Sequence, residues 1–363
     1  MANKQITIKQ CNNSNGYDTL YPQTTAAQTV LSYRTSASFG GSNVTVDSAL
    51  NKIAKKMQAD KKIFVKVLDG KGNPIQGAKI NGLLNSPVTN SSGMVTGIFV
   101  SDPLTIVSPY VDLNDITVNG ASYVGSTNTL TVTLPIVGEN GIKRFTSSQS
   151  VKFSKMIKTV DICCVGGGGG GGNLIISRSG TETYYHESGG GGGGAIVNSY
   201  GKSINADTDY ILSVGSGGVS GTTGGVGGTT TFLSVSATGG GGAYVYQPDS
   251  SSSPIGKGGS AGSSGSGDGG DRNQNGENST ISEFNDGTTF YSGGGGGGGR
   301  KGGTPNGADG AYITGGYPDA SQPHSATTPG IGGGGGGATY DNQIQANLPS
   351  SGGSGLVAIR FHF

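Results

Sequence analysis

The chain has 363 residues, of which 73 are glycine, while Asp, Glu, Lys and Arg together make up only 12%, against about 7% glycine and about 25% charged residues in ordinary globular proteins. Glycine does not recur at every third position and proline numbers only 13, which excludes collagen. A formal net charge of +1 gives no electrostatic footprint for nucleic acid, and no stretch approaches the ~20 apolar residues of a spanning helix, so we expect no membrane insertion.

Residues 1–61 are predicted to form a hairpin followed by a short helix. Ile6 and Ile8 alternate with polar residues, residues 12–16 favour a turn, and residues 17–21 return as a second strand. Asp47 is placed to cap a helix. The apolar residues of that helix recur at helical spacing: Ala49, Leu50, Ile53, Ala54 and Met57. One narrow apolar stripe cannot be buried by a single helix, so we expect it to meet copies of itself in a trimer.

Residues 62–140 are predicted to form a β-sandwich that acts as a spacer. About seven short strands follow one another at the spacing of such sandwiches, separated by turn sequences such as DGKGNP and NSSG. The clearest strands cover residues 63–67, 77–80, 95–100, 104–107, 116–118 and 130–134. The string VKVLDGKGNPIQGAKI resembles prealbumin-like and carboxypeptidase-regulatory-like modules, which serve as spacers and stalks.

The third domain, residues 141–363, is defined by its glycine: 12 glycines lie before residue 141 and the other 61 follow it. Five runs are pure glycine, at 166–172, 189–194, 239–242, 293–299 and 332–337. A flexible linker is one interpretation of such runs. However, the runs lack the serine that linkers mix in, and strand-like segments adjoin several of them, as at 160–165 and 195–197.

The alternative is a packed bundle of polyglycine-II helices. Each would be an extended helix with three residues per turn and ~3.1 Å rise, whose N–H and C=O groups point sideways. Neighbouring helices then pair these groups, and only glycine lets the backbones approach closely enough. The fold class predicted from the sequence is therefore mainly β, with a small C-terminal β-sandwich that carries a polyglycine-II bundle.

Two regions of the chain resemble a known family. ITIKQCNNSNGYDTLYPQT, at residues 6–24, resembles the N-termini of tail or collar fibre proteins of phages and prophages of Gram-positive gut bacteria. VKFSKMIKTVDICCVGGGGGGG, TTTFLSVSATGGGG and GLVAIRF resemble the glycine-rich C-terminal domain of the same proteins. The glycine layout is also similar to the distal adhesins of some T-even-like phages, in which a glycine-helix bundle presents variable loops to the host surface.

The resemblance implies a non-enzymatic adhesin of a virion tail fibre that recognises a bacterial surface receptor, either a glycan or a surface protein. It implies attachment to the phage tail or baseplate through the N-terminus and assembly as a homotrimer. The opening residues lack the apolar core of a secretory signal, so we expect the protein to reach the outside in virions released by host lysis.

Receptor binding is predicted in loops at one end of the bundle, at 173–188, 243–255 and 338–351. Flat aromatic faces and fixed polar groups suit sugars or wall polymers. The candidate residues are Arg178, Tyr184, Tyr185, His186, Tyr244, Tyr246, Tyr340 and Asn342. The competing interpretation is that the tyrosines only cap the bundle and exclude water from its end.

No catalytic, metal or cofactor site is predicted. The Walker-like string at 201–203 has Ile196 where the first glycine is required. Residues 271–276 match the first half of a calcium loop, but its twelfth position is Ser282 and Glu283 comes one residue late. The three histidines lie in separate segments, so spacing alone assembles neither a triad nor a zinc set.

Three alternative functions stay open from the sequence. The protein could be a structural fibre or collar component without receptor binding. It could be an enzymatic tailspike, which would need paired carboxylates in a groove. It could also be an ice-binding glycine bundle, although that function needs a flat, repetitive face, and these inter-run loops are long and irregular.

Overall fold

The computed structural model describes most of residues 61–363 and short segments before them. The ranges outside the description are 1–7, 12–16, 21–29, 32–43, 46–49, 52–53, 56–60, 174, 180–181, 187, 247–254, 265, 272–273, 296–299, 302–329, 339 and 342–348. The chain forms two compact units: Met1–Val107 with Asp115–Leu134, and Ser108–Asn114 with Pro135–Phe363. No helix in the described ranges has the length and hydropathy to cross a bilayer.

The N-terminal residues contain the predicted hairpin. Strand β1 (Ile8–Cys11) pairs antiparallel with β2 (Tyr17–Leu20), and Ile8 lies opposite Leu20. A second pair joins β3 (Val30–Leu31) to β4 (Val44–Thr45). The predicted helix after Asp47 falls mostly outside the described residues; those described within it, 50–51 and 54–55, have helical backbone and are exposed.

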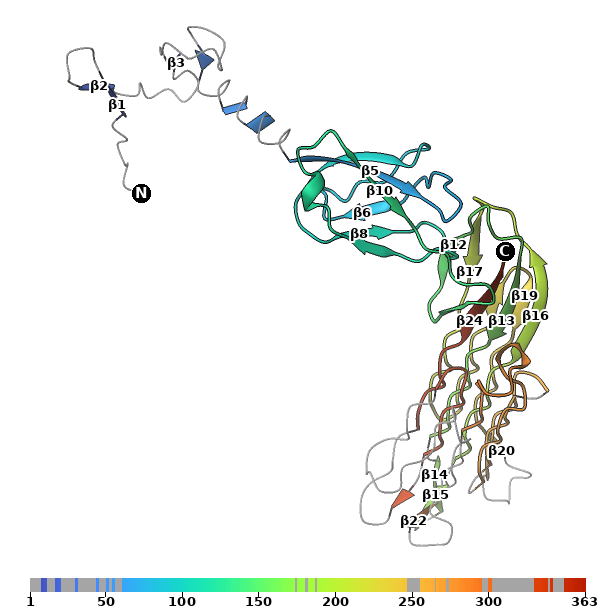
Figure 1. The fold of residues 1–363 in the computed structure, drawn as a ribbon. Coiled ribbons are helices and arrows are strands. Elements are labelled where there is room, and N and C mark those ends of the chain that lie inside the picture. The colour runs from blue at the N-terminus through green and yellow to red at the C-terminus, as the bar shows by residue number, and fades with distance from the viewer. Residues whose placement is uncertain are drawn as a thin grey trace. The chain divides into compact units, whose positions relative to one another are not determined.

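Two three-stranded sheets form the rest of the first unit, and Figure 1 shows them as two layers. In the first sheet β5 is central, parallel to β10 and antiparallel to β7; in the second, β8 lies between β6 and β9. The elements are β5 (Lys62–Leu68), β6 (Lys79–Asn81), β7 (Met94–Ile98), β8 (Leu104–Val107), β9 (Ile116–Val118), the 3-10 turn η1 (Ala121–Tyr123) and β10 (Thr129–Thr133). Strand alternation buries Ile63, Val65 and Val67 completely, as the apolar pattern predicts.

The second unit starts from a small sandwich. One layer is an antiparallel sheet in the order β11-β24-β13-β16; the other joins the pairs β12–β17 and β18–β19 through a bridge between Ser213 and Thr231. The strands are β11 (Ile142–Phe145), β12 (Gln149–Lys152), β13 (Thr159–Val165), β16 (Ile196–Ser203), β17 (Asp209–Leu212), β18 (Thr230–Phe232), β19 (Val235–Ala237) and β24 (Leu356–His362).

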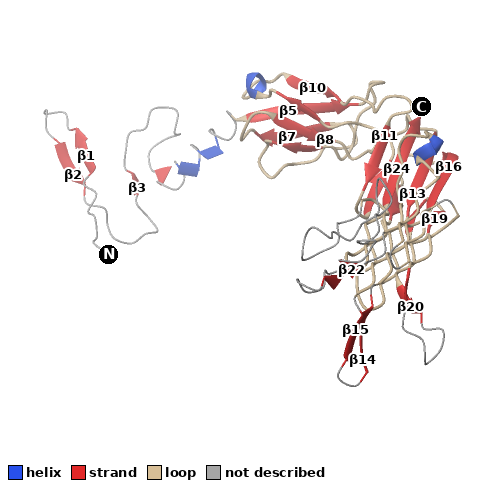
Figure 2. Ribbon diagram, turned by 90° about the horizontal axis from the view of Figure 1, so that it is seen from below, coloured by secondary structure: helices blue, strands red, loops and turns tan. Residues whose placement is uncertain are grey.

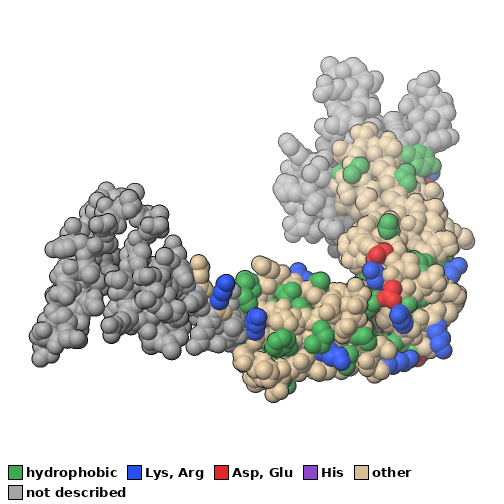
Figure 3. Space-filling model, turned by 90° about the horizontal axis from the view of Figure 1, so that it is seen from above, with side chains coloured by type: hydrophobic (Ala, Val, Ile, Leu, Met, Phe, Trp, Pro, Cys, Tyr) green, Lys and Arg blue, Asp and Glu red, His purple; other side chains and the backbone are tan. Residues whose placement is uncertain are grey.

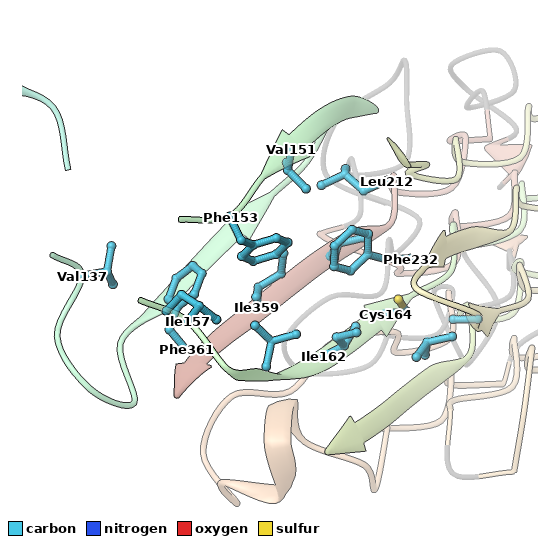
Figure 4. Packing of buried hydrophobic residues seen from close by; sticks show 14 of the residues in the cluster. Val137, Val151, Phe153, Ile157, Ile162, Cys164, Leu212, Phe232, Ile359 and Phe361 are labelled. Carbon is cyan, nitrogen blue, oxygen red and sulfur yellow. The ribbon is translucent and has the colours of Figure 1, made fainter. Parts of the chain in front are cut away.

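The core between these layers is aromatic. Phe153 contacts the rings of Phe232 and Phe361 at centroid distances of 6.5 and 6.4 Å, and all three are essentially buried (Figure 4). Cys164 belongs to this cluster, whereas Cys163 belongs to a second cluster on the opposite face of β13. Because both faces of β13 are covered, its last four residues, 162–165, form a continuous apolar run instead of alternating with polar residues.

The strands of the sandwich continue directly into glycine segments. Strand β13 leads into residues 166–172, and residues 189–194 lead back into β16. In the same way β17, β18, β19 and β24 adjoin residues 215–221, 224–228, 239–243 and 350–355. Figure 2 shows these segments as a lattice of loops below the sheet. The positions of the strands in the sandwich therefore determine where six neighbouring glycine segments begin or end.

The central run, residues 166–172, donates its amides to three segments in strict rotation. Every third residue faces the same neighbour, and all three neighbours run antiparallel to it. The pairs, with N···O distances of 2.8–3.0 Å, are Gly166–Ala195, Gly169–Gly192 and Gly172–Gly189; Gly167–Gly228 and Gly170–Gly225; Gly168–Gly353 and Gly171–Ser350. A period of three is that of the polyproline-II helix, so the run is a polyglycine-II helix.

The carbonyl groups of the central run accept from three further segments, which run parallel to it. The pairs, at 2.8–3.3 Å, are Gly240–Gly167 and Ala243–Gly170; Gly218–Gly168 and Gly221–Gly171; Gly335–Gly169 and Ala338–Gly172. The second run, 189–194, is surrounded in the same manner: it donates to segments 267–270 and 332–335 and to Gly241, and it accepts from 166–172, 258–262 and 295. The hydrogen bonds contradict the flexible-linker interpretation for these residues.

The approach of the backbones explains why the runs are pure glycine. A Cβ added at any of residues 167–171 would lie 1.9–2.0 Å from a carbonyl oxygen of a neighbouring segment, far below the 3.0 Å that real Cβ contacts respect. Two valines within the glycine segments face solvent: Val219 and Val226 are 70% and 71% exposed. On the face seen in Figure 3 few charged side chains lie on the bundle.

Candidate functional site

Three strand pairs lie at the end of the bundle remote from the sandwich, which we call the distal end (Figure 1). The first is the hairpin of β14 (Ile175–Ser179) and β15 (Glu182–His186), which joins the central run to the second run. The others are the hairpin of β20 (Tyr244–Tyr246) with β21 (Ile255–Lys257), and the parallel pair of β22 (Arg300–Lys301) with β23 (Tyr340–Asp341). Chain segments far apart in sequence thus meet at one end.

Seven of the eight predicted site residues lie on these distal strands. Backbone pairing sets Arg178 opposite Thr183, Tyr184 opposite Ser177, Tyr185 opposite Ile176 and His186 opposite Ile175. Tyr244 pairs with Lys257, Tyr246 with Ile255, and Tyr340 with Arg300. Asn342 lies outside the described residues. The seven described candidates therefore lie on three separate strand pairs at the distal end.

The first hairpin is tied to the bundle at its base. The Asn173 amide donates to the Gly221 carbonyl at 2.6 Å, and the Ser188 hydroxyl donates to the Gly172 carbonyl while accepting the Ala338 amide at 2.9 Å. Ser188 is buried. These bonds connect the base of the hairpin to two other segments and so hold it in a fixed position on the bundle.

A groove of about 340 Å³ opens beside Tyr244. Three glycine segments shape it, and the middle one is bonded to both others: the Gly241 amide donates to Ser260, and the Gly269 amide donates to Gly259, each at 2.8 Å. The lining residues are Gly241, Gly242, Tyr244, Gly258, Gly259, Ser260, Asp268, Gly269 and Asp271. Tyr244, one of these lining residues, is 48% exposed. We refer to this site below as the Tyr244 groove.

Two carboxylates in the Tyr244 groove are held by backbone amides. Asp271 accepts the Gly258 amide at 2.8 Å through Oδ1 and pairs with the Lys257 ammonium at 2.6 Å through Oδ2. Asp268 accepts the Ala261 amide through Oδ1, and its side chain is exposed. Carboxylate oxygens accept hydrogen bonds and Ser260 can both donate and accept, so the groove suits a ligand rich in hydroxyl groups.

The sequence indicated Tyr244 but missed Asp268, Asp271 and Ser260. The sequence pattern suggested only the start of a calcium loop at Asp271. In the described part of the chain no three His, Cys, Asp or Glu residues are grouped to hold a metal ion. The signal available in the sequence was that residues 258–270 contain a single charged residue, Asp268, and that Asp271 follows directly after this segment.

A second polar cluster lies at the sandwich end, under the turn η2 (Glu283–Asn285). Glu283 is fully buried, pairs with Arg144 at 3.0 Å and accepts the Tyr291 hydroxyl at 2.6 Å. Burial and then the bond to Glu283 raise the pKa of Tyr291. Phe284 stacks on the Arg360 guanidinium at 4.6 Å. The cluster covers the second face of the sheet, which makes it part of the scaffold.

Comparison with known families agrees with the glycine architecture. The family model described as a glycine-rich domain matches residues 144–362, well over half of the chain. No curated protein matches the chain. The matched range begins in the first strand of the sandwich sheet, at β11, and ends in β24, so it takes in both the sandwich and the bundle. The chain therefore belongs to the glycine-rich domain family.

Proposed function

We propose that the protein is a non-enzymatic adhesin, a phage tail fibre component that binds a bacterial surface receptor through the distal end of its glycine bundle. The observation that carries the proposal is the division of the second unit into a closely packed glycine scaffold and a set of distal strand pairs. No side chain fits at residues 167–171, whereas strand pairs of differing length emerge beyond the runs. Rigid scaffolds with surface loops of this kind are typical of binding proteins.

The other parts of the chain have roles in the same proposal. The N-terminal residues attach the protein to the tail or baseplate, and the two-sheet unit at residues 62–134 acts as a spacer. The central run finds all its hydrogen-bond partners in its own chain. Homotrimer formation, which we retain in the proposal, therefore rests on segments other than that run. The virion, released by host lysis, is the proposed location.

The proposal is tested by adsorption of the labelled full chain to a panel of Gram-positive gut bacteria. In one variant residues 175–186 are replaced by a short Gly-Ser turn, which leaves Asn173 and Ser188 in place. A matched control replaces residues 205–208, the turn between β16 and β17 at the sandwich end. We expect the distal replacement to abolish or redirect adsorption and the control to keep it. Equal adsorption by all three proteins would contradict a distal receptor site.

A further inference from the structure

We propose that the Tyr244 groove binds an uncharged, hydroxyl-rich segment of a surface glycan, about one or two sugar rings long. This inference rests on the proposed function and names the class of ligand for a groove on the flank of the bundle, which reaches the distal end at Tyr244, the first residue of β20. Sites for small ligands have volumes of about 300–1,000 Å³. The groove, at about 340 Å³, lies at the lower end of that range.

The walls of the groove are fixed backbone. A Cβ added at Gly258, Gly259 or Gly269 would lie 1.9–2.2 Å from a carbonyl oxygen of an adjacent segment, so these walls cannot change shape by ordinary substitution. The amides of Gly259 and Gly262 also donate to the second run at 2.9 and 2.8 Å. A wall that is already ordered loses little conformational entropy when a ligand binds.

The choice of ligand therefore depends on the four side chains that line the groove: Tyr244, Ser260, Asp268 and Asp271. The exposed Tyr244 ring offers a flat apolar face, which matches the C–H face of a pyranose ring. Asp268 uses Oδ1 for the Ala261 amide, and among the described residues its Oδ2 has no hydrogen-bond partner. That oxygen can accept from one or two ligand hydroxyl groups.

The charge of the groove disfavours an anionic ligand. The Asp271 charge is balanced by Lys257 at 2.6 Å, which leaves Asp268 as the excess charge of the lining. A phosphate or carboxylate of a polyanionic wall polymer would be repelled by Asp268 and would have to displace Lys257 from Asp271. Hydroxyl groups meet neither obstacle, because they donate to carboxylates without carrying charge.

The experiment titrates the full chain calorimetrically with three neutral probes, the β-methyl glycosides of galactose, glucose and N-acetylglucosamine. Poly(glycerol phosphate) serves as the polyanionic probe. We expect at least one neutral probe to bind and the polyanion not to bind. Tyr244→Ala and Asp268→Asn should each weaken the binding about tenfold or more, whereas Tyr244→Phe should retain it because the ring stays. Val226→Ala, an exposed substitution on another segment, is the control.

Circular dichroism and thermal unfolding of each variant separate loss of binding from loss of fold. Asp268 is exposed, and in Asp268→Asn the amide oxygen can still accept the Ala261 amide. Binding of the polyanion alone, absence of binding by all probes, or full binding by Tyr244→Ala and Asp268→Asn would overturn the inference. If cells still adsorb those two variants normally, the groove is not the receptor site although the proposed function stands. If neutral sugars bind but no cell adsorbs the chain, the groove stands and the proposed function fails.

Discussion

The amide of Gly169 donates to the carbonyl of Gly192 at 2.8 Å, and this bond joins the two glycine runs that are enclosed on all sides by other segments of the chain. Gly169 also accepts the Gly335 amide at 2.9 Å, so both of its backbone groups are used inside the bundle. Glycine loses more conformational entropy on folding than any other residue. The paired amides and carbonyls offset that loss, at about 0.5–1.5 kcal/mol for each hydrogen bond.

An alanine scan across residues 167–171 should find no tolerant position. Successive residues face different neighbours, and each added Cβ would meet a backbone oxygen at 1.9–2.0 Å. We expect each substitution to lower the free energy of unfolding of the second unit by about 3 kcal/mol or more, because backbone cannot move aside as a side chain can. Gly138→Ala is the control, since nothing lies within 4 Å of its added Cβ. Denaturant unfolding measures both; a tolerant position every third residue would contradict the enclosed helix.

Asp161→Asn should destabilise the sandwich at neutral pH. Burial alone would raise the pKa of Asp161, but the Gly201 amide, His362 and Arg360 outweigh it and hold the pKa below its ordinary value of 3.8. A depressed pKa contributes stability above pH 3.8 that is lost as the pH falls through the folded value. We expect a loss of about 2 kcal/mol at pH 7 that shrinks below pH 4.

Urea unfolding of wild type and Asp161→Asn at pH 7, 4 and 3 measures this difference. The matched control is Asp209→Asn, whose carboxylate is 68% exposed and pairs with Lys152 at 3.4 Å. Exposed pairs contribute little, so the control should stay close to wild type at every pH. A pH-independent loss for Asp161→Asn would show that its charge is not the cause.

The effect of Asp112→Asn on stability should have the opposite pH dependence. Burial raises the pKa of Asp112, although bonds from the Ser154 hydroxyl and amide oppose the shift. With a raised pKa the folded state binds the proton more tightly, so the contribution of Asp112 falls as pH rises from 3.8 through the folded value. Asparagine keeps an acceptor for the Ser154 amide and removes the buried charge. We expect a change of less than about 1 kcal/mol at pH 7, and a variant whose stability relative to wild type improves from pH 3 to pH 7.

Neither Cys163 nor Cys164 should react with a thiol reagent in the native protein. Burial raises the pKa of Cys164 to about 12 and, with the Glu283 charge, raises that of Cys163 as well. The thiolate is the reactive form, so little is present at pH 8. In a Cys11→Ser background we expect no thiol to titrate with a chromogenic disulfide until urea unfolds the domain, and two thiols afterwards. Rapid native labelling would place one face of β13 in solvent.

Much of the architecture follows from local sequence patterns. Pure glycine runs next to strand-like segments predict enclosed polyglycine-II helices, because no other residue permits backbones this close. Alternation predicts the strand at 63–67, and the spacing of short strands predicts those at 104–107 and 116–118; β5, β8 and β9 occupy the same places. Family resemblance extended the sequence account to a tail fibre adhesin, which stays a proposal.

What the sequence did not predict depends on long-range packing. The sequence analysis assigns no element to residues 283–291, yet Glu283, Phe284 and Tyr291 are buried there and cover one face of β13. The fit requires positive φ at Phe284 and Asn285, 49° and 57°, which no propensity favours for a phenylalanine. In the same way Asp268 and Asp271 meet Tyr244 only because the chain reverses twice between them, and spacing along the sequence does not show that meeting.

The most direct test of the account is an adsorption isotherm of the labelled full chain on a panel of Gram-positive gut bacteria, with heat-unfolded protein as the control. The account predicts saturable adsorption to some strains and not to others, lost when the bundle is unfolded. Absent adsorption by the folded chain, or unsaturable adsorption to every strain alike, would contradict a receptor-binding role and leave a structural fibre component.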